Sequence, residues 1–335
     1  MTNANTALVL GASGGIGGEV AARLRDAGWD VRAMKRGAQA SGGRAADGIE
    51  WVRGDAMNRQ DVAQAARGRA VIVHAVNPPG YRRWSELVLP MLDNTLLAAA
   101  AEHATVVLPG TVYNFGPDQR PILFEGAPQR PRTRKGAIRV AMEDRLRDFS
   151  RSEGRALIVR AGDFFGTRAG NNWFAQGLVR PGKPVRTVYN PGQPGVGHQW
   201  SYLPDVARTI AELLARREAL EAFSSFHMAG QWDADGTQMV RAIQRVVARR
   251  TGAEPGVRPF PWWAVRLGSP FVTTFREMQE MRYLWNEPVK MDNTRLVAAL
   301  GREPHTPLDL AVEASLEGLG CLAHDGHGAS HALTP

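Results

Sequence analysis

The sequence has a single cysteine, Cys321, among its 335 residues. One thiol cannot form an internal disulfide, which fits a reducing compartment, and we expect the cytoplasm. No charged leader precedes the first apolar stretch at about Ala7, and no apolar run approaches the roughly 20 residues that span a bilayer. The sequence therefore predicts neither a signal peptide nor a membrane partner.

Acidic residues are in the minority, with 33 Asp and Glu against 41 Lys and Arg, for a net charge of +8. The excess is scattered, and its densest stretch, Arg130 to Arg139, lacks aromatic residues on which bases could stack. This pattern argues against nucleic acid as a partner and favours a solvated basic face or a pocket for a phosphate-bearing ligand. The sequence also lacks a metal-ligand cluster, a P-loop and a Ser-His-Asp order, so we expect no metal site.

What the sequence does have is a glycine-rich turn near its start. The apolar run Ala7 to Leu10 predicts a strand, and a helix with apolar residues at spacings of three and four follows the glycines. Such a strand, turn and helix open a dinucleotide-binding βαβ unit, in which the helix start and its dipole favour a phosphate. Gly11 permits the tight turn, Gly14 lets the backbone approach a pyrophosphate, and Gly17 lets the helix lie close to the strand. The residues predicted to contact the phosphates are Gly11, Ser13, Gly14, Gly15, Ile16 and Gly17.

The three-residue spacing of these glycines resembles the short-chain dehydrogenase/reductase superfamily. Two later motifs resemble its extended or atypical branch, which includes nucleotide-sugar epimerases and dehydratases. Arg160 to Gly166 is similar to that branch's Arg-Pro…Tyr-Gly turn, and Trp200 to Ala207 is similar to its strand leading into an Asp-Val-Ala helix start. The alternating strands and helices of the first half independently predict a parallel, doubly wound α/β sheet.

The resemblance implies a Rossmann-type doubly wound parallel sheet with a smaller C-terminal substrate lobe. We expect residues 1–165 to form the dinucleotide-binding domain, with 205–230 returning to it. Residues 166–204 and 231–322 would form the substrate lobe, and 323–335 a flexible tail. A homodimer is a possible assembly.

The end of the second predicted strand indicates which cofactor is preferred. A NAD-binding unit usually has an acidic residue there, which takes the ribose hydroxyls. This sequence has Lys35-Arg36 instead, and two cations would attract the 2′-phosphate that an acid repels. We therefore expect NADP in preference to NAD, the alternative being an ordinary basic loop.

Other cofactor contacts follow from the resemblance. Asp55, with Ala56 after it, would lie near the adenine amino group, although Asp55 could also organise the turn into the next helix. The remaining predicted contacts are Ala75, Val76, Asn77, Arg139, Ala161 and Phe164.

The catalytic set of the superfamily is altered in this sequence. Members use a serine hydroxyl, a tyrosine acid or base, and a lysine four residues later that lowers the tyrosine pKa. Here the serine position is Pro109, so Thr111 is the nearest hydroxyl. Aligning a common glutamate of the family with Glu143 puts Arg139 at the lysine position and Lys135 at the tyrosine position.

No tyrosine lies between Tyr113 and Tyr189, so the standard tyrosine–lysine pair is absent. The candidate catalytic residues are therefore Thr111, Tyr113 and Lys135. Lys135 could act as an acid only if its pKa is depressed, and the alternative is an exposed charge at a helix start. Arg139 can donate to ribose hydroxyls but cannot relay protons. Tyr113 has the right chemistry, or else a structural role.

Aromatic residues beside amides suggest a small polar, sugar-like substrate. The alternatives are that the tryptophans pack the core and that the histidine is structural. The candidate substrate-binding residues are Asn171, Asn172, Trp173, His198 and Trp200. Two functions follow: an NAD(P)-dependent oxidoreductase or epimerase/dehydratase-like enzyme with a non-standard proton-transfer site, or a non-catalytic NADP-binding sensor.

Overall fold

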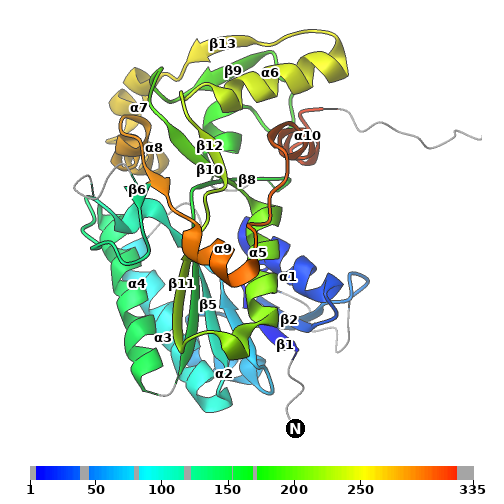
Figure 1. Cartoon of the computed structure of the whole chain (residues 1–335), viewed down its shortest axis with the longest axis vertical. Coiled ribbons are helices and arrows are strands. Elements are labelled where there is room, and N and C mark those ends of the chain that lie inside the picture. Colours follow the sequence, from blue (N-terminus) through cyan, green and yellow to red (C-terminus); the bar gives the residue numbers. More distant parts are fainter. Residues whose placement is uncertain are drawn as a thin grey trace, which may run out of the picture.

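The fold is organised around a seven-stranded parallel sheet in the order β11-β7-β5-β4-β1-β2-β3 (Figure 1). It is seen in a computed structural model that describes residues 5–37, 45–78, 83–116, 122–152, 154–168 and 172–322. The strand order reverses between β4 and β1, which in such sheets is where ligands bind. The predicted Rossmann-type fold is confirmed. The strands are β1 (Thr6–Leu10), β2 (Asp30–Lys35), β3 (Glu50–Arg53), β4 (Val71–His74), β5 (Thr105–Thr111), β7 (Arg155–Ala161) and β11 (Phe223–His227).

Helices cover both faces of this sheet because the strands are buried on both sides. Along β1, Ala7 and Val9 face one apolar core, whereas Leu8 and Leu10 face the other. Each fully buried aliphatic side chain of this kind contributes about 1.5–3 kcal/mol. The first core is shared with α1 (Gly15–Asp26) and α5 (Leu203–Ala215), and the second with α2 (Arg59–Ala66), α3 (Trp84–Glu102) and α4 (Arg134–Arg151).

A smaller lobe stands on the carboxyl ends of these strands (Figure 1). Its core is aromatic, with Trp173, Trp200 and Trp285 packed against one another and against Phe165. Two small sheets form its frame: β8 (Asp163–Phe165), β10 (His198–Tyr202) and β12 (Gln231–Asp233) in one, and β9 (Thr187–Asn190) and β13 (Gly256–Pro259) in the other. Its helices are a π-helix (Phe174–Leu178), α6 (Gln238–Thr251), α7 (Trp262–Gly268), α8 (Thr273–Glu280), a 3-10 helix (Arg282–Trp285) and α10 (Leu308–Gly318).

One segment departs from the predicted division. Helix α9 (Thr294–Leu300) falls within 231–322, the part expected in the lobe, but its Leu296 and Leu300 pack into the core of the main sheet, beside β11 and α5. Just before it, β14 (Lys290–Met291) pairs with β6 (Ile122–Leu123). The chain therefore crosses back to the main sheet once more than the sequence suggested. The predicted tail, 323–335, lies outside the described residues.

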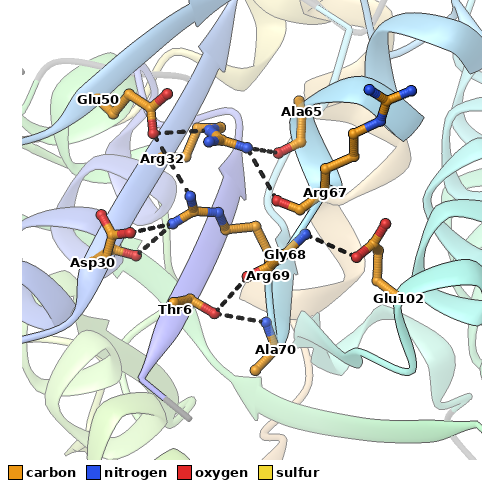
Figure 2. Close-up of polar contacts among 10 residues, drawn as sticks. All are labelled: Thr6, Asp30, Arg32, Glu50, Ala65, Arg67, Gly68, Arg69, Ala70 and Glu102. Atoms are coloured by element: carbon orange, nitrogen blue, oxygen red, sulfur yellow. Dashed lines mark hydrogen bonds and ion pairs between the residues drawn. The ribbon is translucent and has the colours of Figure 1, made fainter. Parts of the chain in front are cut away.

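A polar cluster lies at the amino ends of the strands, at the end of the sheet away from the lobe, and Figure 2 shows its contacts. Arg69 pairs with Asp30 at 2.6 Å and reaches Glu50 at 3.8 Å, and Arg32 donates to Glu50 at 2.9 Å. Arg32 also donates to the carbonyls of Ala65 and Arg67, so the turn between α2 and β4 is fixed to the amino ends of β2 and β3. The role of this polar cluster is structural.

None of the described helices is both long and apolar enough to cross a bilayer.

Candidate functional site

The glycine turn after β1 has the shape of a phosphate-binding loop. Gly11 has φ +85°, and a Cβ there would lie 2.5 Å from the Ala75 carbonyl oxygen. A Cβ at Gly17 would lie 2.3 Å from the Gly11 carbonyl oxygen, so both glycines are required by close approach of the backbone. At Gly14, by contrast, the contact found in the described part of the chain is 3.3 Å, again to Gly11. That contact is tight but is the one neighbour found within 4 Å among the described residues, so Gly14 is the least enclosed of the three glycines.

The start of α1 has features that favour the binding of an anion. Its N-cap residue is Gly14, which has no side chain to accept a hydrogen bond from the helix, and its first turn has no acidic residue. The first N–H groups of a helix have no intrahelical partner and carry the positive end of the helix dipole. A dinucleotide pyrophosphate fits this position.

The predicted adenosine end of the site lies beside β2. The register of β1 and β2 pairs Leu10 with Met34, which puts Lys35 and Arg36 next to the Gly11 turn. Both side chains are exposed, and the Lys35 Nζ lies 4.5 Å from the centroid of the Trp51 ring. Two cations thus stand where the cofactor ribose is expected.

Asp55, after β3, organises its own turn. Its Oδ1 accepts the Met57 N–H at 3.0 Å, and its N–H donates to Asp61 at 2.8 Å. The local role considered for Asp55 is therefore present. Ala56 is buried beside it, and its carbonyl accepts from Asn94.

The predicted nicotinamide end lies where β4, β5 and β7 end side by side. The Ala75 N–H donates to the Leu10 carbonyl at 3.0 Å, which holds the Ala75 to Asn77 loop against the glycine turn. Arg139 on α4 is buried, with its guanidinium 5.2 Å from the Trp84 ring, and its Nη2 is 3.5 Å from the Asn77 Oδ1. All predicted cofactor residues therefore lie along one edge of the sheet, with Ala161 and Phe164 at its β7 end.

A pocket that is partly open to solvent lies between this edge and α8. It brings together all three candidate catalytic residues, Thr111, Tyr113 and Lys135. The other lining residues are Gly162, Asp163, Phe164, Asn172, Trp173, Gln176, Thr274, Glu277, Met278 and Met281.

Lys135 occupies the first turn of α4 and is only 4% exposed, so the alternative of an exposed charge is wrong. Thr133 caps the helix by accepting the Gly136 N–H at 2.9 Å, which fixes the turn that carries the lysine. The Lys135 Nζ lies 2.9 Å from the Glu277 Oε2. Burial lowers the pKa of Lys135, while the hydrogen bond and charge of Glu277 partly oppose the shift. The direction of this shift is the one that acid–base chemistry by a lysine requires.

Tyr113 is the end of a buried hydrogen-bonded chain. Its hydroxyl donates to the Asp163 Oδ1 at 3.2 Å, and the Asp163 Oδ2 lies 2.9 Å from the His198 Nε2. The His198 Nδ1 lies 3.2 Å from the Leu284 carbonyl, which can only accept, so that nitrogen carries a proton. His198 therefore lies between the Leu284 carbonyl and the Asp163 carboxylate, directly behind the Tyr113 hydroxyl.

The candidate substrate residues separate into two groups. Asn172 and Trp173 line the pocket, although Asn172 also accepts the Ala175 N–H at 2.8 Å to start the π-helix. His198 lies behind Asp163, stacked on Trp285 at 3.8 Å, and Trp200 is buried beside it in the lobe core. These last two do not line the pocket: Trp200 packs the lobe core, as the alternative expected, and His198 is joined to the pocket wall by Asp163. Asn171 lies outside the described residues.

The sequence patterns did not indicate that Asp163 or the residues of α8 belong to the site. Thr274, Glu277, Met278 and Met281 recur at the three- and four-residue spacing of one helix face, a signal that this face is covered. The spacing could not reveal that Lys135, from a distant part of the chain, covers it.

Comparisons with known proteins agree with this architecture. A sequence model of the NAD dependent epimerase/dehydratase family matches residues 7–229. The structure is similar to UDP-glucose 4-epimerase from Brucella ovis in complex with NAD, with 16% identity, a TM-score of 0.73, and coverage of 94% of this chain and 98% of that one. UDP-glucose 4-epimerase from Thermus thermophilus, in a complex with NAD, has 20% identity and a TM-score of 0.68, with coverage of 94% of this chain and 98% of that one.

A putative epimerase from Burkholderia cenocepacia has 18% identity and a TM-score of 0.70, over 96% of this chain and 99% of that one. At such identities the likeness establishes the fold. Among curated proteins, no match to the sequence is found.

Proposed function

Because the chain belongs to the NAD dependent epimerase/dehydratase family, we propose that it is an NAD(P)-dependent enzyme of epimerase or oxidoreductase type. The observation that carries the proposal is the pocket itself. It unites Thr111, Tyr113 and Lys135 beside the end of the predicted nicotinamide site, and it holds an acid–base group of depressed pKa. A sensor would need the dinucleotide site but not this constellation.

The glycine turn and the uncapped start of α1 support binding of the cofactor pyrophosphate. When bound, a nicotinamide supplies a carbon that can accept and return a hydride. Arg139 would hold the nicotinamide ribose in place of the usual lysine, because its guanidinium donates to hydroxyls. Lys35 and Arg36 favour NADP over NAD, since both are exposed beside the turn.

In this proposal Lys135 moves the proton. As the neutral amine it accepts the hydroxyl proton of a substrate alcohol while the carbon–hydrogen bond is broken, and as the ammonium it returns the proton to a carbonyl. Glu277 fixes the Nζ position and stabilises the ammonium. Thr111 orients the substrate oxygen. Tyr113, backed by Asp163 and His198, is the rival donor on the same wall.

The substrate class is a small polar, sugar-like molecule. Amides of Asn172 and Gln176 beside the Trp173 ring support this class, because sugars present hydroxyls and a flat apolar face. The similar solved structures include UDP-glucose 4-epimerases, which makes sugar nucleotides the first compounds to test.

The test compares single substitutions in the pocket by the change in nicotinamide absorbance. Lys135→Met should lower turnover by about 10²–10⁴, the usual contribution of an acid–base group. Arg139→Met should act mainly on cofactor affinity, and Tyr113→Phe tests the rival donor. Lys183→Met, which removes an exposed lysine, is the matched control and should change nothing.

The pH dependence of turnover distinguishes a role of Lys135 in proton transfer from a purely structural role. Since Glu277 raises the pKa of Lys135 against the effect of burial, Glu277→Gln should lower that pKa. In the direction of carbonyl reduction, where Lys135 must be protonated, the basic limb of the pH profile should therefore move to lower pH. If Lys135→Met and Tyr113→Phe both stay within a few-fold of the wild type, neither residue is the acid. If sugar nucleotides, ketones and aldehydes all fail to react while NADP binds, the protein is a sensor.

A further inference from the structure

Apolar side chains gather on the outer face of α7, α8 and the turn between them. We name this face, formed by Trp263, Arg266, Leu267, Phe271, Val272 and Arg276, the hairpin face. Phe271 is 89% exposed, Trp263 71% and Leu267 70%, the three largest exposures among the described large apolar residues. Single exposed apolar residues are ordinary, whereas a group of this size at one place marks an interaction site.

The exposure follows from the helix geometry. Trp262 and Val265 form the inner stripe of α7: Val265 is buried, and the Trp262 Nε1 donates to the Pro191 carbonyl at 2.9 Å. Trp263 and Leu267, four residues apart, lie together on the opposite stripe. The lobe therefore holds one side of α7 firmly and presents the other to solvent.

The tip of the hairpin is held in shape by its backbone. The N–H groups of Phe271 and Val272 both donate to the Gly268 carbonyl, at 3.0 and 2.9 Å. The Phe275 ring lies so close to Gly268 that a Cβ there would meet it at 2.6 Å. Phe271 and Val272 are thus presented on an ordered turn.

The charge of the segment has one sign. Residues 255–276 include no Asp or Glu, and their three charged residues, Arg258, Arg266 and Arg276, are all exposed. Of the acidic residues that flank the segment, Glu254 accepts from Gln244 of α6, and Glu277 and Glu280 contact Lys135 on the inner side. The outer surface is therefore cationic and aromatic, which complements a negatively charged surface with an apolar layer beneath it.

We propose that the hairpin face binds the surface of an anionic lipid bilayer. Trp263, Leu267 and Phe271 enter the boundary between headgroups and acyl chains, and Arg266 and Arg276 contact the headgroup phosphates. The contact is peripheral, and it departs from the expectation from sequence that the protein has no membrane partner. In Figure 1 α7 and α8 lie at the side of the lobe opposite α10.

This contact would place the pocket near the bilayer, because Thr274, Glu277 and Met278 on the inner side of α8 line it. The binding itself does not depend on which reaction the pocket performs.

The experiment is co-sedimentation of the full chain with large vesicles, either pure phosphatidylcholine or phosphatidylcholine with phosphatidylglycerol at about 30%. We expect binding to the anionic vesicles that weakens as salt is raised. Phe271→Ser should lower the partition coefficient at least tenfold, and Arg266→Gln and Arg276→Gln about fivefold each. Leu310→Gln, at an exposed apolar residue of α10, is the matched control and should bind as the wild type does.

Because Phe271 is almost fully exposed, its substitution should leave the melting temperature unchanged. The proposal is wrong if the wild type does not sediment with anionic vesicles, or if Phe271→Ser and Leu310→Gln bind equally. It is also wrong if the wild type self-associates without lipid and Phe271→Ser abolishes that association, since the face then joins two copies of the chain.

Discussion

At the scale of single residues, burial decides what a side chain can do at this site. Lys135 and Lys35 are both lysines beside the same edge of the sheet. The first is enclosed and paired with Glu277, and burial lowers its pKa, whereas the second is exposed. The enclosed lysine suits proton transfer, and the exposed one suits recognition of a phosphate.

The cofactor preference is a prediction at this scale. NADP should bind at least tenfold tighter than NAD, a difference of about 1.4 kcal/mol. Arg36→Asp should reverse much of that preference, because a carboxylate accepts from the ribose hydroxyls and repels a 2′-phosphate. Titration calorimetry with both cofactors measures it. Arg67→Asp, exposed at the opposite edge of the sheet, serves as the control. Equal wild-type affinities would contradict the assignment.

At the scale of secondary-structure elements, the turn between β1 and α1 divides its glycines between folding and binding. Gly11 and Gly17 face backbone atoms at distances that exclude a side chain, whereas the nearest atom to a Cβ at Gly14 is 3.3 Å away. The same short segment therefore contains two glycines that the backbone requires and one whose Cβ would meet a single atom of the described chain, in a tight contact.

Two substitutions in this turn should separate those roles. Gly14→Val should lower dinucleotide affinity more than tenfold with a small change in stability, because its side chain fills the ligand's space. Gly17→Ala should instead destabilise the fold by about 1–3 kcal/mol, since its Cβ would clash with the Gly11 carbonyl. Affinity by calorimetry and unfolding in urea measure the two effects. Unchanged affinity in Gly14→Val would mean that all three glycines serve only the chain's geometry.

At the scale of the whole molecule, two buried histidines connect stability to pH. The His74 Nδ1 hydrogen bonds the Thr95 hydroxyl at 2.8 Å, and the His227 Nε2 accepts from Arg160 at 2.9 Å. Burial, then a nearby arginine in each case, lowers the pKa of each to about 3. Both imidazoles are therefore neutral in the folded protein at pH values where the unfolded chain is protonated.

The sign follows from the protons bound. Between pH 6.5 and about 3 the unfolded state binds more protons, so stability is full above pH 6.5 and falls as the pH is lowered. Each histidine should cost about 1.4 kcal/mol per pH unit in that range, or about 2 kcal/mol at pH 5. Urea unfolding from pH 7 to pH 5 measures the slope. His74→Gln and His227→Gln should each reduce it, and an unchanged slope in both variants would show that other groups set it.

The sequence alone determined the main sheet and the edge at which a cofactor is predicted to bind. Glycine spacing, buried apolar runs and strand–helix alternation are local patterns, and the carboxyl ends of parallel strands must meet at one edge. That geometry is why Thr111, Tyr113 and the residues around Gly11 could be predicted from sequence to lie together.

Only the tertiary structure decided which side chains complete the pocket. Glu277 meets Lys135, Asp163 turns toward both Tyr113 and His198, and α9 returns to the main sheet. These contacts join segments distant in sequence across the two parts of the fold. No local periodicity constrains such contacts, because they depend on how the lobe packs on the sheet.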